Sequence, residues 1–127
     1  MANKYFDNWT SLAEIERDFN VSTGLEDRDI LIAVYTYEDY SGQAFVLYEK
    51  GGELFEVHGS HCSCNGLEGE GRPGEGWRPE LTTWGALGIR TWLDWPKDFQ
   101  KVVKGLIQEG LNPVVRKTCW ERLLGDA

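Results

Sequence analysis

"QAFVLYEKGGELFEVHG" (Gln43–Gly59) is the stretch that decides the fold of this chain. Two runs rich in apolar, aromatic and β-branched residues flank the pair Gly51–Gly52. Residues of these types favour strands. A two-residue Gly-Gly link favours a tight hairpin, because both turn positions need a positive φ to match the twist of the strands. We therefore predict antiparallel strands over Gln43–Lys50 and Glu53–His58.

A third strand is predicted immediately upstream of this hairpin. The run DILIAVYTY is dense in the same residue types, and the predicted strand covers Ile30–Tyr37. The next residues, EDYSG (Glu38–Gly42), have the composition of a turn. The three strands together predict an antiparallel meander.

Helical periodicity appears in three other segments. TSLAEIERDF (Thr10–Phe19) has one apolar face, and Ser11 with Glu14 has the spacing of a capping box. Leu81–Arg90 contains threonines suited to cap a short helix. The third and most strongly periodic segment is Pro96–Glu109, which has lysines opposite its apolar stripe.

In the helix over Pro96–Glu109, the spacing predicts that Phe99, Val102 and Leu106 are buried and that Gly110 ends the helix. On this prediction the substitution Leu106→Ala costs roughly 2–5 kcal/mol. The whole apolar stripe consists of Phe99, Val102, Val103, Leu106 and Ile107.

The predicted fold class is α+β, with a small antiparallel β-meander packed by helices, chiefly Pro96–Glu109. The length of 127 residues fits a single domain over residues 1–127. Five glycines and two prolines predict a long exposed loop at Gly66–Pro79. Pro113–Thr118 is predicted as an edge strand and Cys119–Leu124 as a helical turn. The sequence shows neither a run of about 20 apolar residues nor a secretory signal, which predicts a cytoplasmic protein.

The charge of the chain is negative and uneven. Residues 1–96 contain 17 acidic and 7 basic residues, whereas residues 97–127 contain 4 acidic and 6 basic residues. Phosphates should repel such a chain, so direct binding to nucleic acid is not expected. Binding to a membrane is not expected either, because no apolar run is long enough to span one. The charge favours a protein partner with a basic surface, although acidity also serves solubility alone. The sequence leaves the oligomeric state open.

Both histidines and two of the three cysteines lie within seven residues. Zinc is bound tetrahedrally by such side chains, but the adjacent His61 and Cys62 would point to opposite sides of an extended chain. Three local ligands are feasible, with a fourth from Cys119, Glu68 or water. The candidate zinc ligands are His58, His61, Cys62 and Cys64.

Two other interpretations of the same stretch stay open. A histidine could activate Cys62 or Cys64 as a nucleophile, but such pairs normally come from distant segments, so no catalytic residue is assigned. Alternatively, the strand ends at His58, and a compact turn buries the two cysteines as small apolar side chains. The turn-forming residues would be Gly59, Ser60, Ser63, Asn65 and Gly66.

The string GSHCSCNGLE (Gly59–Glu68) resembles a group of small tailed-phage proteins of unassigned function. In this chain it follows the strands AFVLYEKGGELFEVH (Ala44–His58) and precedes a W-x-PE segment (Trp77–Glu80). The resemblance covers about Ile30–Arg90. The chain differs from this group by the glycine-rich extension GEGRPGEG (Gly69–Gly76). The resemblance implies no catalytic residues.

This resemblance implies a small, acidic, phage-encoded protein in the cytoplasm of the host cell. Together with the charge, it favours binding and inhibition of a host factor, as an anti-CRISPR or anti-restriction protein does. The alternative is a small zinc-binding domain with a structural Cys/His site. The third possibility is a thiol- or metal-dependent enzyme. The balance favours a protein without enzymatic activity.

Overall fold

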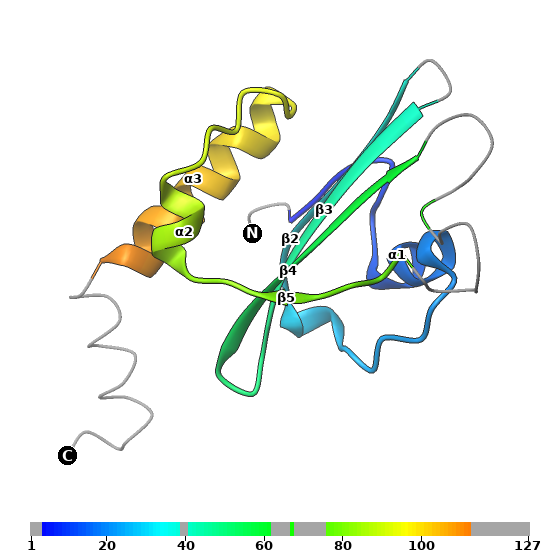
Figure 1. Cartoon of the computed structure of the whole chain (residues 1–127). Coiled ribbons are helices and arrows are strands. Elements are labelled where there is room, and N and C mark those ends of the chain that lie inside the picture. Colours follow the sequence, from blue (N-terminus) through cyan, green and yellow to red (C-terminus); the bar gives the residue numbers. More distant parts are fainter. Residues whose placement is uncertain (1–3, 39–40, 62–66, 68–75, 113–127) are drawn as a thin grey trace. The chain divides into compact units, whose positions relative to one another are not determined.

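The computed structural model describes residues 4–38, 41–61, 67 and 76–112, which form a five-stranded sheet and helices (Figure 1). The predicted α+β class is therefore confirmed. The chain divides into two compact units, Met1–Leu81 and Thr82–Ala127, which we call the sheet unit and the helical unit. Each is described by itself. The single domain over residues 1–127, and the packing of the helix Pro96–Glu109 on the sheet, stay predictions.

The sheet is mostly antiparallel, and its strands lie in the order of the sequence. The predicted meander forms its centre, with β2 paired to β3 and β3 to β4. A short parallel strand is added at one edge and a two-residue antiparallel strand at the other. The strands are β1 (Tyr5–Asp7), β2 (Ile30–Glu38), β3 (Ser41–Lys50), β4 (Glu53–His61) and β5 (Glu80–Leu81).

The Gly-Gly hairpin forms as predicted, since φ is 61° at Gly51 and 80° at Gly52. Two predicted boundaries are wrong. The strand β4 does not end at His58 but continues to His61, because its last residues pair with the beginning of β3. For the same reason the predicted turn over Glu38–Gly42 is too long, since Glu38 and Ser41 already face each other as partners in the sheet.

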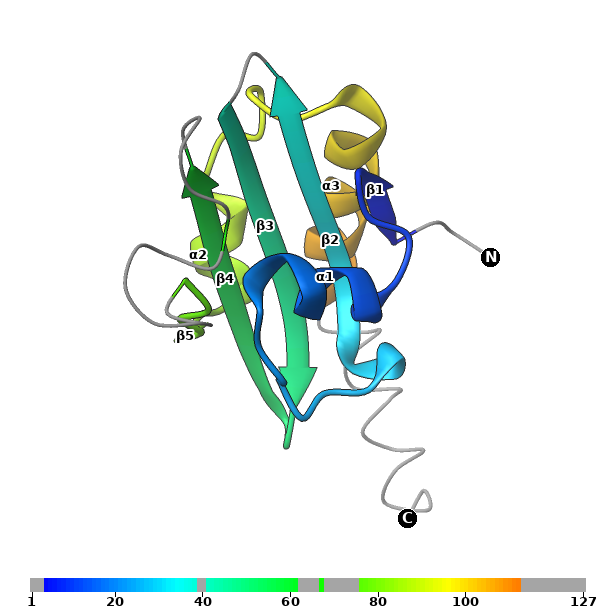
Figure 2. The same ribbon diagram turned by 90° about the vertical axis from the view of Figure 1, so that its right-hand side faces the viewer.

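The helix α1 (Leu12–Phe19) lies across one face of the sheet (Figure 2). Its N-terminus is capped by Ser11, whose hydroxyl accepts a hydrogen bond from the backbone N–H of Glu14. The carboxylate of Glu14 in turn accepts from the backbone N–H of Thr10 at 2.5 Å. The apolar face of the helix points inward as predicted, and Ile15 and Phe19 are fully buried. The other members of this core are Tyr5, Trp9, Ile30, Ala33, Tyr35, Ala44, Val46, Tyr48, Val57 and Leu67.

The first strand and the segment before β2 hold each other in place. The backbone N–H of Ala33 donates to the carbonyl of Lys4 at 2.8 Å, and Lys4 forms an ion pair with Asp27 in the 3-10 helix η1 (Asp27–Asp29). The phenol of Tyr5 donates to the same Asp27 carboxylate. Neither β1 nor η1 is predicted from the sequence.

The helical unit contains α2 (Trp84–Gly88) and α3 (Lys97–Leu111). The Thr83 hydroxyl caps α2 by accepting from the backbone N–H of Ala86 at 3.0 Å. The predicted end of the longer helix at Gly110 is wrong, because α3 continues through it. A Cβ added at Gly110 would lie 2.2 Å from Cδ2 of Trp84, so glycine is needed here for the close approach of α2.

The buried face of α3 differs in part from the prediction. Phe99 is buried as expected, but Val102 and Leu106 are only half-buried. The buried positions are spaced four residues apart, Phe99, Val103 and Ile107. The reason is the position of α2, which packs against the side of α3 that carries Ile107 and Gly110.

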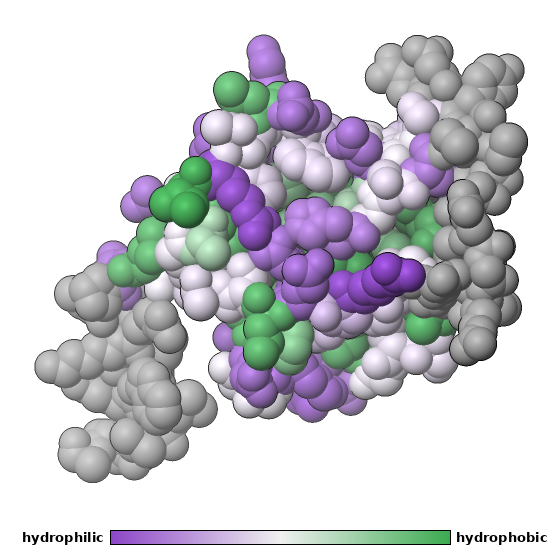
Figure 3. Space-filling view, in the orientation of Figure 1, coloured by the Kyte–Doolittle hydropathy of each residue, from purple (hydrophilic) through white to green (hydrophobic). Residues whose placement is uncertain are grey.

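Several predictions fall outside the described residues, among them the strand over Pro113–Thr118 and the turn over Cys119–Leu124. Of the predicted glycine-rich loop, the structure describes Leu67, which is buried, and Gly76–Pro79, which has no regular secondary structure. None of the helices among the described residues is long and apolar enough to cross a membrane. On the face of the molecule seen in Figure 3, apolar residues are interspersed among hydrophilic ones. Among the described residues, the large exposed apolar side chains are Tyr37, Leu81, Ile89, Leu93 and Leu111.

Candidate functional site

The two histidines of the predicted metal site lie on opposite faces of β4. They are three residues apart in a strand, and successive strand residues alternate between the two faces. His58 contacts the ring of Phe45 across the sheet, with ring centroids 5.2 Å apart. His61 instead contacts Tyr35 on the face that α1 covers. The structure therefore does not bring His58 and His61 together.

The two cysteines of the predicted site, Cys62 and Cys64, lie outside the described residues. Within the described part of the chain, no group of three or more His, Cys, Asp or Glu side chains is arranged to hold a metal ion. A zinc site that combines both cysteines with His58 or with His61 stays a prediction.

A polar contact between two strands of the sheet unit joins His61 to Tyr35. The Nε2 atom of His61 lies 2.6 Å from the Tyr35 hydroxyl oxygen. In the sheet, His61 is the partner of Gly42, which also lies opposite Tyr37. A Cβ at Gly42 would lie 2.6 Å from His61 Nε2 and 2.8 Å from Cε1 of Tyr35. Glycine at this position therefore makes room for the tyrosine–histidine pair.

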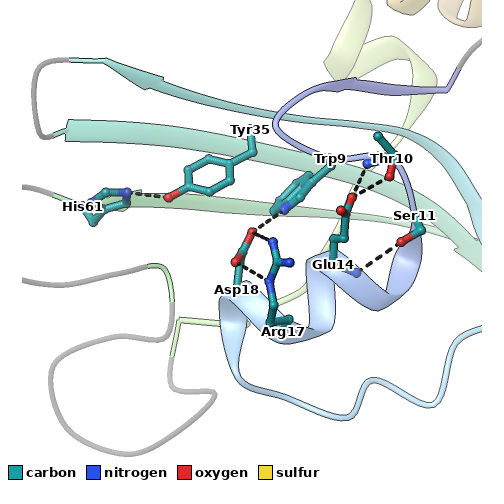
Figure 4. Close-up of polar contacts among 8 residues, drawn as sticks. All are labelled: Trp9, Thr10, Ser11, Glu14, Arg17, Asp18, Tyr35 and His61. Carbon is teal, nitrogen blue, oxygen red and sulfur yellow. Dashed lines mark hydrogen bonds and ion pairs between the residues drawn. The ribbon is translucent and has the colours of Figure 1, made fainter.

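The other side of the Tyr35 ring is supported by Trp9 (Figure 4). The two ring centroids lie 5.3 Å apart, and Trp9 is itself fixed by donating from Nε1 to the carboxylate of Asp18 at 2.8 Å. Asp18 also forms an ion pair with the exposed Arg17. The site thus combines one helix and two strands, with Asp18 on α1, Tyr35 on β2 and His61 on β4.

The electrostatics of this site keep Tyr35 protonated. Burial raises the pKa of Tyr35 to about 12, and the negative charge of Asp18 and the neighbouring Tyr37 add to this effect. A phenol with such a pKa is not suited to act as a base or a nucleophile near neutral pH. It can instead donate its proton to the His61 Nε2 and hold the imidazole in a fixed orientation. The chemistry of the site is therefore that of a positioned imidazole beside aromatic rings.

The stability of the sheet unit should fall as the pH rises from about 10 to about 12. In the unfolded chain Tyr35 loses its proton near its ordinary pKa of 10, whereas the folded state holds the proton up to about 12. The unfolded state is thus favoured increasingly over this range. Urea denaturation at a series of pH values measures the effect, and Tyr35→Phe should make the decline shallower. The decline should not vanish, because burial also raises the pKa of Tyr48. An equally steep decline in the variant would contradict the assignment.

The opposite face of β4 carries a carboxylate–imidazole contact, made by the other histidine, His58. The Nε2 atom of His58 lies 2.5 Å from Oε1 of Glu56, a side chain that is only 4% exposed. The strand partner of Glu56 is Glu80 on β5, so two acidic residues face each other across this pair of strands. Like charges at such positions repel, and the contact with His58 gives the Glu56 carboxylate a hydrogen-bonding partner on its own strand. Each histidine thus belongs to a different environment.

Four residues of this site are not predicted from the sequence, namely Tyr35, Trp9, Asp18 and Gly42. One signal could have found Gly42, because the tight hairpin at Gly51–Gly52 fixes the pairing along β3 and β4. The contacts of Trp9 and Asp18 have no comparable signal in the sequence. No family model matches the chain, and no curated protein or solved structure shows a significant match to it.

Proposed function

We propose that this chain is a non-enzymatic binding protein whose acidic sheet unit engages a basic host protein and inhibits it. The observation that supports this proposal is the distribution of charge between the two units. Met1–Leu81 contains 16 acidic and 6 basic residues, a net charge of −10. Thr82–Ala127 contains 5 acidic and 7 basic residues, a net charge of +2. The net negative charge of the protein is therefore carried by the sheet unit.

Many acidic side chains of the sheet unit serve the local fold. Glu16 accepts from the backbone N–H of Thr23 at 2.8 Å, and Asp29 accepts from the backbone N–H of Glu26 at 2.8 Å. The bond from that backbone N–H also holds the pKa of Asp29 below its ordinary value. These carboxylates have a structural role, so they alone do not indicate a partner.

Two acidic residues beside the Gly-Gly turn have no such role. Glu49 and Glu53 are exposed at the ends of β3 and β4, and among the described residues neither forms an ion pair or a side-chain hydrogen bond. Their charges are available to a partner. Exposed charges of this kind chiefly accelerate association and select partners of opposite charge.

The nature of the partner follows from the charge and from the phage resemblance. A strongly acidic surface competes with nucleic acid for the groove of a protein that handles nucleic acid. Restriction and CRISPR effectors have such grooves, and small acidic phage proteins that block them act in the host cytoplasm. We therefore propose an anti-defence role.

Reversing the charges of Glu49 and Glu53 should weaken the complex with the host partner by about tenfold or more. The partner would be captured from host lysate, identified, and purified, and its Kd would be measured for the parent and for Glu49→Lys/Glu53→Lys. Raising the salt from about 0.1 M to about 1 M should also weaken binding, because the Debye length falls from about 10 Å to about 3 Å.

A matched control changes the net charge equally on the other unit. Asp94→Lys/Glu109→Lys replaces two exposed acids of the helical unit, and we expect it to leave the Kd almost unchanged. Equal losses for the two double variants would contradict an acidic face on the sheet unit. A Kd that does not change with salt would contradict the electrostatic mechanism itself.

A further inference from the structure

A continuous series of aromatic rings leads from the core of the sheet unit to its surface. It begins at Trp9, which is 1% exposed, and passes through Tyr35 to Tyr37, which is 52% exposed. The rings of Tyr35 and Tyr37 meet edge to face, with centroids 6.3 Å apart. The His61 ring lies beside both, and its centroid is 5.1 Å from that of Tyr37 and 5.9 Å from that of Tyr35. We call Tyr37 and His61 the aromatic platform.

The residues beneath this platform are held firmly. Tyr35 is fixed by its contact with the His61 imidazole on one side and by the Trp9 ring on the other (Figure 4). Gly42 lies between Tyr37 and His61 in the sheet and has no side chain to separate them. A ring that is already ordered loses little conformational entropy on binding, which is why tyrosines contribute strongly at interfaces.

The platform also belongs to the strongly acidic unit of the protein. Asp18 lies close enough to Tyr35 for its charge to help raise the pKa of that phenol. The sheet unit as a whole carries a net charge of −10. An exposed aromatic face in a negative field favours a cation over an apolar or an anionic group.

We propose that the aromatic platform is the docking point for an arginine side chain of the basic partner. This inference rests on the proposed function and adds to it the position and the chemistry of one contact. A guanidinium is planar, always charged and weakly hydrated, so it stacks on a tyrosine ring more readily than the strongly hydrated ammonium of lysine does. The ring of Tyr37, which is 52% exposed, supplies the aromatic face on which the guanidinium stacks.

The test uses the full chain and a defined probe, a blocked peptide of alternating arginine and glycine. NMR titration should show shifts of the Tyr37 ring protons with the arginine peptide, weaker shifts with a lysine peptide and none with a glutamate peptide. Tyr37→Ala should weaken binding of the arginine peptide by about two- to fivefold, the factor expected for an exposed cation–π contact. Tyr37→Phe retains the ring and should bind as the parent does.

Leu81→Ala is the matched control, because Leu81 is another large exposed side chain of the sheet unit, 65% exposed. It should bind the peptide as the parent does. Thermal melting verifies that each variant is folded. If Tyr37→Ala binds the peptide with the affinity of the parent, or the parent does not bind it, the inference is overturned.

The proposed function is judged separately, by the salt dependence and the Glu49→Lys/Glu53→Lys variant. Loss of partner binding in that variant, with an unchanged affinity in Tyr37→Ala, would retain the acidic face and reject the arginine site. The reverse result is also informative. If peptide binding depends on Tyr37 but partner binding changes neither with salt nor with charge reversal, the arginine site is retained and the acidic face is rejected.

Discussion

Replacing Phe19 by alanine should lower the free energy of unfolding of the sheet unit by about 3–5 kcal/mol. Phe19 is the last residue of α1 and is fully buried. Its ring meets that of Trp77 edge to face at 5.1 Å and that of Trp9 at 6.1 Å. A Cβ added at Gly59 would lie 3.0 Å from its Cζ atom, so the ring rests directly on β4. Alanine would leave a cavity between helix, sheet and loop.

Urea denaturation followed by tryptophan fluorescence measures this loss. Phe19→Leu keeps much of the apolar volume and should cost clearly less. Ala13→Ser, on the exposed side of the same helix, should change the free energy of unfolding by less than about 0.5 kcal/mol. If Phe19→Ala and Ala13→Ser unfold at the same urea concentration, then α1 does not pack on the sheet as described.

The sequence contained enough to place both histidines in the sheet. A two-residue turn pairs Lys50 with Glu53, and each further step along β3 is matched by a step along β4, so His61 falls opposite Gly42. The prediction that the strand ends at His58 failed because Gly59 was interpreted as a turn former. In the structure Gly59 lies within the strand, and glycine is needed there because the Phe19 ring occupies the space that a side chain at position 59 would fill.

Other features could not be predicted, because they depend on contacts between distant segments. The strand β1 has only three residues, too few for a periodic pattern, and it pairs in parallel with β2 across more than twenty residues. The hydrogen bond from Trp9 to Asp18 connects the loop before α1 to the helix. Nothing in the type or spacing of these two residues predicts that they are partners. The contact of Tyr35 with His61 likewise requires the register of two neighbouring pairs of strands at once.

The acidic residues of α1 show how a pattern can be interpreted correctly and still mislead. Their spacing places Glu14, Glu16 and Asp18 off the apolar face of the helix, and none of the three is fully buried, although Asp18 contacts the core residue Trp9. The structure shows that each also accepts a hydrogen bond from a residue outside the helix. The bond from the Thr10 backbone lowers the pKa of Glu14. Counting acids in a sequence therefore overestimates the charge that is free to meet a partner.

In the helical unit, Ile107→Ala should lower the free energy of unfolding by about 2–5 kcal/mol. Ile107 is 5% exposed, and its Cγ2 atom would lie 3.4 Å from a Cβ added at Gly88 of α2. The side chain therefore fills the space between α2 and α3, and its removal leaves a cavity that the backbone of Gly88 cannot fill. The loss should appear as a lower midpoint of urea denaturation.

Two substitutions on the same helix make this prediction specific to one face. Leu106 is half-buried, and none of its atoms lies within 4 Å of a Cβ added at Gly88, so Leu106→Ala should cost less than Ile107→Ala. Lys101 is exposed, and Lys101→Ala should cost less than about 0.5 kcal/mol. The order Ile107, Leu106, Lys101 reflects burial against α2, because all three residues lie in the same helix. If Leu106→Ala proves the most costly of the three, the most deeply buried side of α3 is not the side that faces α2, and the described packing of the two helices is wrong.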